Sequence, residues 1–288
     1  MMIWLVFALI TAFSEGTKDL FSKRAMRNVD PVVSAWSLSA FAFLFLLPLL
    51  FFIEKPVLGP WFWPTVLIQG VMLSITLIIY MQAIRASPLS ITLPMLSFTP
   101  AFMLVTSPLI LGESPGLAGK LGVLLIALGA YVLNVQKIGE GLFKPLSALF
   151  SEQGARLMLV VAFIWSITAN VDKIGVVNSS PLFYATIIMA AVTLGLTPIM
   201  HFKSEDYRRQ LSENLRGLVP IGFFMALGVA SQMTAISLTL TAYVISVKRT
   251  SILIGSVYGF IFFSEKNIRA RLTGALIMVC GVILISLF

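Results

Sequence analysis

The chain of 288 residues has few charged residues, one cysteine and one histidine. Asp, Glu, Lys and Arg make up only 11% of it, whereas hydrophobic residues make up 58%. A soluble domain of this size could not bury so much apolar side chain, so the composition indicates a polytopic membrane protein. The single Cys280 excludes a disulfide framework and a thiolate metal cluster. The lone His201, at a predicted helix end, is read as a surface residue rather than a metal ligand or general base.

Motifs for catalysis are also missing. The sequence has no glycine-rich ATP-binding loop, no metal-ligand spacing and no nucleophile motif. We therefore expect neither an enzyme nor a cofactor. The first span does not read as a signal peptide, because it lacks a basic leading segment and a small-residue cleavage pattern and carries Glu15, Lys18 and Asp19 within its helix.

Apolar runs long enough to cross a bilayer recur along the chain. A hydrocarbon core about 30 Å thick needs roughly 20 helical residues. Backbone groups in lipid must be satisfied within the chain, and the period-two alternation of a membrane barrel is absent, so we predict an all-α fold of ten transmembrane helices. The predicted spans are Ile3 to Ser22, Val32 to Ile53, Trp61 to Ile84, Leu89 to Leu111, Leu117 to Val135, Leu157 to Val176, Leu182 to Met200, Leu218 to Leu238, Thr241 to Phe263 and Leu272 to Phe288.

Two connections between spans are longer than the others. In the central one, residues 137–156, apolar residues at helical spacing beside Lys144 and Glu152 are compatible with an interfacial helix, and a plain tethering linker is the alternative. The second is a charged loop from His201 to Arg216. Neither is long enough for a separate soluble domain.

The two halves of the chain resemble each other. A shift of 150 residues places Lys23 on Lys173, and because the repeat covers five spans, an odd number, the halves must have opposite orientations. We predict a first five-helix repeat at 1–136, a linker at 137–156 and a second repeat at 157–288. A shift of 152 residues superposes Gly70 and Gly222, Ala83 and Ala235, Glu113 and Glu265, Gly122 and Gly274, and Gly129 and Gly281.

Basic residues predict the orientation of the chain. Loops after even-numbered spans hold only Lys55, Lys120 and Lys173 of the 20 Lys and Arg residues, and most of the others follow odd-numbered spans. By the positive-inside rule the odd loops are cytoplasmic and both termini lie on the non-cytoplasmic side. The net charge of +8 thus follows from topology, and no nucleic-acid partner is needed to explain it.

An adjacent basic pair, Lys248 and Arg249, lies within the apolar run from Thr241 to Phe263. A cation at the centre of a span raises the free energy of insertion by roughly 2.5 to 3.5 kcal/mol, so the pair must face protein, water or a ligand. An Arg guanidinium binds phosphate or carboxylate through two hydrogen bonds, and Lys adds a mobile charge. The alternative is permanent pairing with Glu15, Asp19 or Asp172 that locks helices together.

The first span carries a polar face that cannot point at lipid, and we expect it to line a cavity. Glu15 is a candidate for taking up and releasing a proton, and ordinary ion pairs, Glu15 with Lys18 or Asp19 with Lys23, are the alternative. The face consists of Trp4, Ala8, Thr11, Glu15, Lys18, Asp19 and Ser22.

The sixth span has a corresponding, less charged stripe of Ser166, Asn170 and Lys173. Lys173 either assists binding or extends its charged end to the membrane interface. Tyr80, Gln232 and Tyr243 are further candidates for the cavity wall.

Helix ends and prolines supply weaker signals. Pro94 and Pro100 interrupt the fourth span, where Ser97 and Thr99 can satisfy freed carbonyl groups, which predicts either a cavity-lining bend or a packing kink. The repeat-related Glu113 and Glu265 sit at matching helix ends, where either a gate contact or helix capping is expected.

Two five-helix repeats that each end in an acidic residue and a glycine-rich last span resemble the drug/metabolite transporter superfamily, specifically its EamA-type members. The resemblance covers nearly the whole chain and implies a secondary transporter with its substrate site between the halves. The segment from Ser246 to Arg249 also resembles the ninth-helix basic pair of plastid triose-phosphate translocators, which binds substrate phosphate. The sixth-helix lysine of that branch falls on Lys173. The compact chain suggests a bacterial inner membrane.

The sequence therefore predicts a secondary transporter that alternates access around a central site. Lys248 and Arg249 would hold a small organic anion, with Lys173 and Lys18 assisting. Exchange against another anion follows from the translocator resemblance and proton coupling from Glu15, and both stay open. The alternatives are an exporter of amino acids or hydrophobic drugs, in which the basic pair is internally neutralised, and a lipid flippase.

Overall fold

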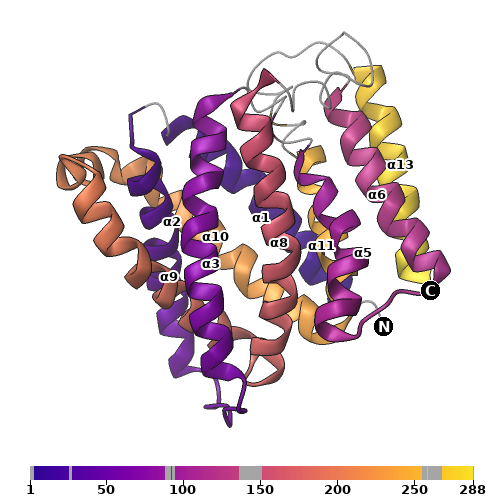
Figure 1. Cartoon of the computed structure of the whole chain (residues 1–288), viewed down its shortest axis with the longest axis horizontal. Helices are drawn as coiled ribbons and strands as arrows, with labels where there is room; N and C mark the ends of the chain where they lie inside the picture. The colour runs from indigo at the N-terminus through magenta and orange to yellow at the C-terminus, as the bar shows by residue number, and fades with distance from the viewer. Residues whose placement is uncertain are drawn as a thin grey trace.

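The computed structural model describes residues 3–25, 28–87, 92, 95–135, 151–254, 258 and 268–287. In these residues the chain forms ten α-helices and a 3₁₀ helix, without strands (Figure 1), and each predicted span overlaps one of the α-helices. The all-α prediction is confirmed. The elements are α1 (Ile3–Ala25), α2 (Pro31–Leu46), η1 (Leu47–Phe51), α3 (Phe62–Ala86), α5 (Phe98–Leu111), α6 (Leu117–Val135), α8 (Gln153–Val177), α9 (Pro181–Lys203), α10 (Tyr207–Leu238), α11 (Thr241–Lys248) and α13 (Ile268–Leu287).

Local sequence explains where several helices begin and end. The second helix of each half starts at a proline, Pro31 in α2 and Pro181 in α9, whose missing N–H would have no helical partner there. The Asp30 side chain caps α2 by accepting a 2.8 Å hydrogen bond from the backbone N–H of Val32. Gly112 ends α5 in the left-handed conformation, with φ of 69°.

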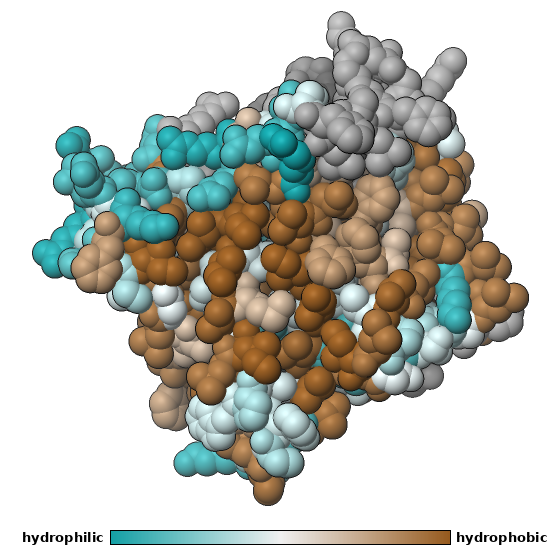
Figure 2. Space-filling model, in the orientation of Figure 1, coloured by the Kyte–Doolittle hydropathy of each residue, from teal (hydrophilic) through white to brown (hydrophobic). Residues whose placement is uncertain are grey.

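The surface of the bundle is that of a membrane protein. Figure 2 shows a broad hydrophobic band between hydrophilic surfaces at the two ends of the molecule. Five helices are long and apolar enough to span a bilayer by length and composition: Pro31–Phe51, Phe62–Ala86, Gln153–Val177, Pro181–Lys203 and Tyr207–Leu238. Large apolar side chains such as Leu109 of α5 and Leu194 of α9 are exposed, and lipid would cover them in a membrane.

The predicted charged loop from His201 to Arg216 is instead mostly helical. Helix α9 continues to Lys203 and α10 starts at Tyr207, with Asp206 between them at a positive φ of 54°. Arg209 Nε lies 2.7 Å from Glu213 Oε1 one turn along α10, a pairing that supports an exposed helix. The loop prediction was wrong because hydropathy detects only the part of a helix that lies in lipid.

Residues 136–150, where an interfacial helix was one prediction, lie outside the described residues.

Helices α6 and α13, the last of each half, lie side by side in Figure 1 and pack closely through glycines. A Cβ on Gly122 would come within 2.9 Å of the Gly281 carbonyl oxygen, and one on Gly129 within 2.7 Å of that of Gly274. The sequence repeat aligns Gly122 with Gly274 and Gly129 with Gly281, so each glycine of α6 contacts the repeat equivalent of the other one. This arrangement requires the equivalent helices α6 and α13 to run antiparallel, which confirms the inverted repeat.

Other helices also pack against helices of the opposite half. Helix α1 packs chiefly on α10 and, reciprocally, α3 packs on α8. Helix α1 also contacts α11, as α8 contacts α5. Helices from both halves therefore surround the centre of the bundle, where the polar side chains gather.

Candidate functional site

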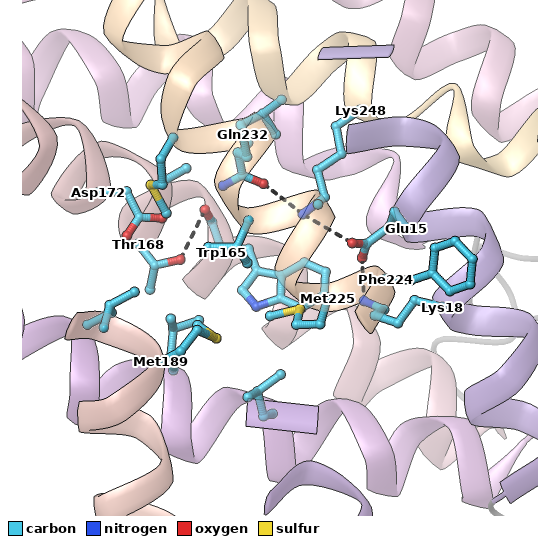
Figure 3. A pocket seen from close by; sticks show the side chains of 18 of the residues that line it. Glu15, Lys18, Trp165, Thr168, Asp172, Met189, Phe224, Met225, Gln232 and Lys248 are labelled. Atoms are coloured by element: carbon cyan, nitrogen blue, oxygen red, sulfur yellow. Dashed lines mark hydrogen bonds and ion pairs between the residues drawn. The ribbon is translucent and has the colours of Figure 1, made fainter. Parts of the chain in front are cut away.

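A cavity of about 70 Å³ lies among α1, α3, α8, α9, α10 and α11 (Figure 3). That volume holds a few water molecules but no metabolite. Its walls combine apolar side chains with a few charged and polar ones, the usual composition of a ligand site. The charged and polar members are Glu15, Lys18, Thr168, Asp172, Gln232, Lys248 and Arg249.

Glu15 on α1 holds two lysines at one end of the cavity. Lys18 Nζ lies 2.8 Å from Glu15 Oε1, and Lys248 Nζ lies 3.4 Å from Glu15 Oε2. Lys248 also donates a 2.9 Å hydrogen bond to Gln232 Oε1, so its ammonium lies between α1 and α10 (Figure 3). The sequence-predicted pairing of Glu15 with Lys18 is present, and Lys248 joins it.

Asp19 extends this cluster to α3. Its Oδ1 accepts a 2.8 Å hydrogen bond from the Tyr80 hydroxyl and lies 3.5 Å from Lys18 Nζ. The Tyr80 ring in turn packs on Trp165, with 5.2 Å between ring centroids. Lys18 and Lys248 are thus balanced by Glu15 and Asp19. The side chain of Lys23, the other predicted partner of Asp19, lies outside the described residues.

The ninth span does not continue as one regular helix through the basic pair. Helix α11 ends at Lys248, and a turn at residues 249–250 separates it from the helical residues 251–254. The backbone N–H groups of Arg249, Thr250, Ile252 and Leu253 donate to the carbonyl oxygen of the third residue back, as in a 3₁₀ turn. The repeat-related position in the first half is Ser97, where a turn precedes α5. Pro100, which lacks an N–H, explains that interruption. Interrupted helices at equivalent places of inverted repeats are typical of transporter binding sites.

Arg249 bridges the two interruptions. Its Nη2 donates a 3.2 Å hydrogen bond to Thr99 Oγ1 at the start of α5, and its Cζ lies 5.5 Å from the centroid of the Trp165 ring. Only 2% of Arg249 is exposed, and its Nε has no hydrogen-bond partner. Among the described residues, no carboxylate oxygen lies within 4.0 Å of its guanidinium.

Asp172 on α8 lies at the opposite side of the cavity from Glu15 (Figure 3). It is 4% exposed, and its Oδ1 accepts a 2.7 Å hydrogen bond from Gln69 Nε2 on α3. Within the described part of the chain, it makes no ion pair. Groups of three or more His, Cys, Asp and Glu residues that could hold a metal ion are also absent from that part.

Three predicted wall residues, Tyr80, Asn170 and Tyr243, lie in helix interfaces instead of lining the cavity. Asn170 is buried against α5, where it donates to Thr106 Oγ1 at 3.2 Å and accepts from Ser107 Oγ at 2.8 Å. Tyr243 packs beside Trp4 and over Gly119 of α6.

Lys173 and Glu113 lie together at the end of the bundle that carries the chain termini. Lys173 Nζ donates hydrogen bonds to the carbonyl oxygens of Ile236 and, at 3.0 Å, Thr239, which caps the end of α10. It also lies 3.7 Å from Glu113 Oε1, while Glu113 Oε2 accepts from the backbone N–H of Thr241. Glu113 therefore links the halves and caps α11. Glu265 and Pro94 lie outside the described residues.

The sequence analysis missed Trp165, Gln69 and the separate position of Asp172. It followed the stripe of Ser166, Asn170 and Lys173 on the sixth span, whereas the cavity face is the neighbouring one with Trp165, Thr168, Ala169 and Asp172. A tryptophan and a carboxylate seven residues apart on one helical face were the available signal.

Comparison with known proteins agrees with this architecture. The sequence model of the EamA-like transporter family matches residues 2–135 and again residues 153–287. An uncharacterized transporter of Archaeoglobus fulgidus is 23% identical over 291 residues, covering 99% of each chain. A crystal structure of a protein with 13% sequence identity has the same fold, with a TM-score of 0.78 over 99% of this chain and 96% of that one.

Proposed function

Because the chain belongs to the EamA-like transporter family, we propose that it is a secondary-active transporter of a small organic anion. Membership makes it an integral multi-pass membrane transporter of small molecules rather than an enzyme. The proposal adds the charge of the substrate and the residues that bind it.

The observation that carries the proposal is the buried guanidinium of Arg249, which has no carboxylate oxygen within 4.0 Å among the described residues. Glu15 and Asp19 act on it only over a longer distance. Burying a cation without a close counter-charge is costly, so an arginine kept in this state needs a functional reason. An anion in the cavity would supply both a close counter-charge and an acceptor for the free Nε–H. A phosphate or carboxylate fits the planar, multiply donating guanidinium best.

Lys248 has a secondary role in this proposal. It is shared between Glu15 at 3.4 Å and Gln232 at 2.9 Å, and the longer contact is the one that a substrate oxygen could replace. The Trp165 ring, which both Lys248 and Arg249 approach, provides an aromatic wall for the organic part of the substrate. Lys18 contributes positive charge from α1.

Transport would proceed by alternating access. A volume of about 70 Å³ cannot hold the substrate, so the halves must separate before it enters. The contact of Lys173 with Glu113 joins the halves at the end with the termini, which the distribution of basic residues assigns to the non-cytoplasmic side. In a bacterial cell the membrane would be the inner one.

A second candidate is an exporter of amino acids or hydrophobic drugs with an internally neutralised basic pair. The contact of Lys248 with Glu15 favours it, because that half of the pair already has a counter-charge.

The test is thermal stabilisation of the purified protein by phosphates, phosphonates, carboxylates, zwitterions and cations, with an Arg249→Gln variant. A ligand stabilises the folded state to which it binds. We expect anions alone to stabilise the parent and the variant to bind them roughly 10- to 100-fold more weakly, since a charged hydrogen bond contributes about 1.5 to 3 kcal/mol.

The matched control is Arg208→Gln, which removes an exposed arginine and should bind like the parent. Equal stabilisation of parent and Arg249→Gln by cations or neutral compounds would instead favour the exporter.

A further inference from the structure

Two charged groups of the cavity remain after the ion pairs are assigned. Lys18 and Lys248 are balanced by Glu15 and Asp19. Arg249 and Asp172 both line the cavity, and in the described part of the chain neither has an oppositely charged partner within 4.0 Å. The net charge of the cavity therefore depends on whether Asp172 carries a proton.

The surroundings of Asp172 on every packed helix are nearly uncharged. Helix α3 contributes Gln69, α9 contributes the Tyr184 hydroxyl, and the cation in electrostatic contact with Asp172 is Lys248 of α11. The membrane part of α10 and all of α5 contain no titratable residue. Glu15 and Lys18 of α1 lie across the cavity and neutralise each other.

Gln69 can serve both forms of the carboxyl group. Its Nε2 donates to Asp172 Oδ1 at 2.7 Å, and its buried Oε1 has no hydrogen-bond partner. Rotation of the amide by half a turn would present that oxygen as the acceptor for a protonated carboxyl group. Gln69 can therefore hydrogen-bond Asp172 whether or not that carboxyl group carries a proton, whereas Glu15 lies between two lysines.

We infer that Asp172 is a proton-binding site coupled to the anion at Arg249, so that one proton and a monoanion bind and cross together. This inference rests on the proposed function. A proton on Asp172 leaves the cavity with the net positive charge of Arg249, which attracts the anion. Without that proton, the negative charge of Asp172 offsets this positive charge in the cavity as a whole, and the anion would give the cavity a net negative charge in a medium of low dielectric constant. The proton comes from water in the cavity and returns to water on release, with no covalent step.

Linkage gives the sign and size of the effect. Anion binding favours protonated Asp172, and protonation favours the anion by the same factor. Anion affinity should be constant while Asp172 is protonated and fall about tenfold per pH unit once it ionises. Binding in that range should take up a proton from a weakly buffered solution.

The experiment uses methanesulfonate, an anion whose charge is constant between about pH 5 and pH 9, as the probe. Its apparent affinity is measured from thermal stabilisation of the full-length protein in detergent, with Arg249→Gln subtracted as the background for non-specific salt effects. Asp172→Asn should retain binding and lose the pH dependence. The conservative Asp172→Glu should keep a pH dependence, and the exposed Glu213→Gln should match the parent.

Each outcome is decisive. If the parent binds the probe equally at all pH values, or Asp172→Asn keeps the full pH dependence, Asp172 is not the coupled site and the anion site at Arg249 stands. If no stabilisation above the Arg249→Gln background occurs at any pH, the proposed anion site is overturned and the inference with it.

Discussion

Two carboxylates on opposite sides of one cavity, Glu15 and Asp172, are almost equally buried and have different partners. Glu15 is 6% exposed and contacts two lysines, while Asp172 is 4% exposed and accepts a hydrogen bond from an amide. Burial makes either charge costly, and only the partner decides whether the charge persists. The comparison distinguishes Glu15, a structural carboxylate on α1, from Asp172 on α8, which we infer to gain and lose a proton.

The largest expected effect comes from removing the charge of Glu15. Glu15→Gln leaves Lys18 and Lys248 buried with one remaining carboxylate near them, Asp19, and we expect a loss of about 3 to 5 kcal/mol in the free energy of unfolding. Denaturant unfolding in detergent measures it. A loss no larger than that of Asp172→Asn would remove the distinction between the two carboxylates.

A substitution of Lys173 tests whether this lysine, next to Asp172 in sequence, affects the protonation of Asp172. Lys173→Met removes the cap on the carbonyls of Ile236 and Thr239 and the contact with Glu113, for an expected loss of about 1 to 3 kcal/mol. Hydrogen exchange at the Thr241 amide should become faster, because its acceptor Glu113 is released. The pH dependence of anion binding should not change. A change would mean that Asp172 senses the charge of Lys173.

Tyr80→Phe adds a third carboxylate to the comparison, Asp19, whose partners are intermediate between those of Glu15 and Asp172. Asp19 has one lysine and one hydroxyl, so loss of the 2.8 Å hydrogen bond should cost about 1 to 2 kcal/mol. The thermal midpoint should fall less than in Glu15→Gln and more than in Asp172→Asn. A different order would show that ring packing of Tyr80 on Trp165 outweighs the hydrogen bond.

The smallest change in stability is expected for Asp172→Asn. The amide has the shape of the neutral acid and keeps the hydrogen bond with Gln69, so we expect a change below about 1 kcal/mol at neutral pH. A loss comparable to that of Glu15→Gln would indicate a permanently ionised Asp172.

Most of the fold could be predicted from the sequence because lipid imposes simple rules. Span length follows from bilayer thickness, and the crossed glycine contacts of α6 and α13 follow from a repeat visible in the sequence. The extended α10 could not be predicted in the same way, because its first turns lie outside lipid and hydropathy does not register them.

The residues of the candidate cavity could be predicted only in part. Glu15, Lys18, Gln232, Lys248 and Arg249 all reach the cavity, since charged residues in a span must avoid lipid. Avoiding lipid does not specify a cavity, and Asn170 meets the same requirement in the interface with α5.

The sequence by itself determined the membrane class, the helices, the inverted repeat and the set of buried charges, because each follows from hydrophobicity and periodicity along the chain. Only the tertiary structure decided which charges neutralise one another. Lys248 and Arg249 are adjacent in sequence, but helix packing brings Glu15 and Gln232 to the first and Thr99 and Trp165 to the second. Electrostatic pairing depends on distances of a few ångströms between helices, and those distances are set by packing across the two halves.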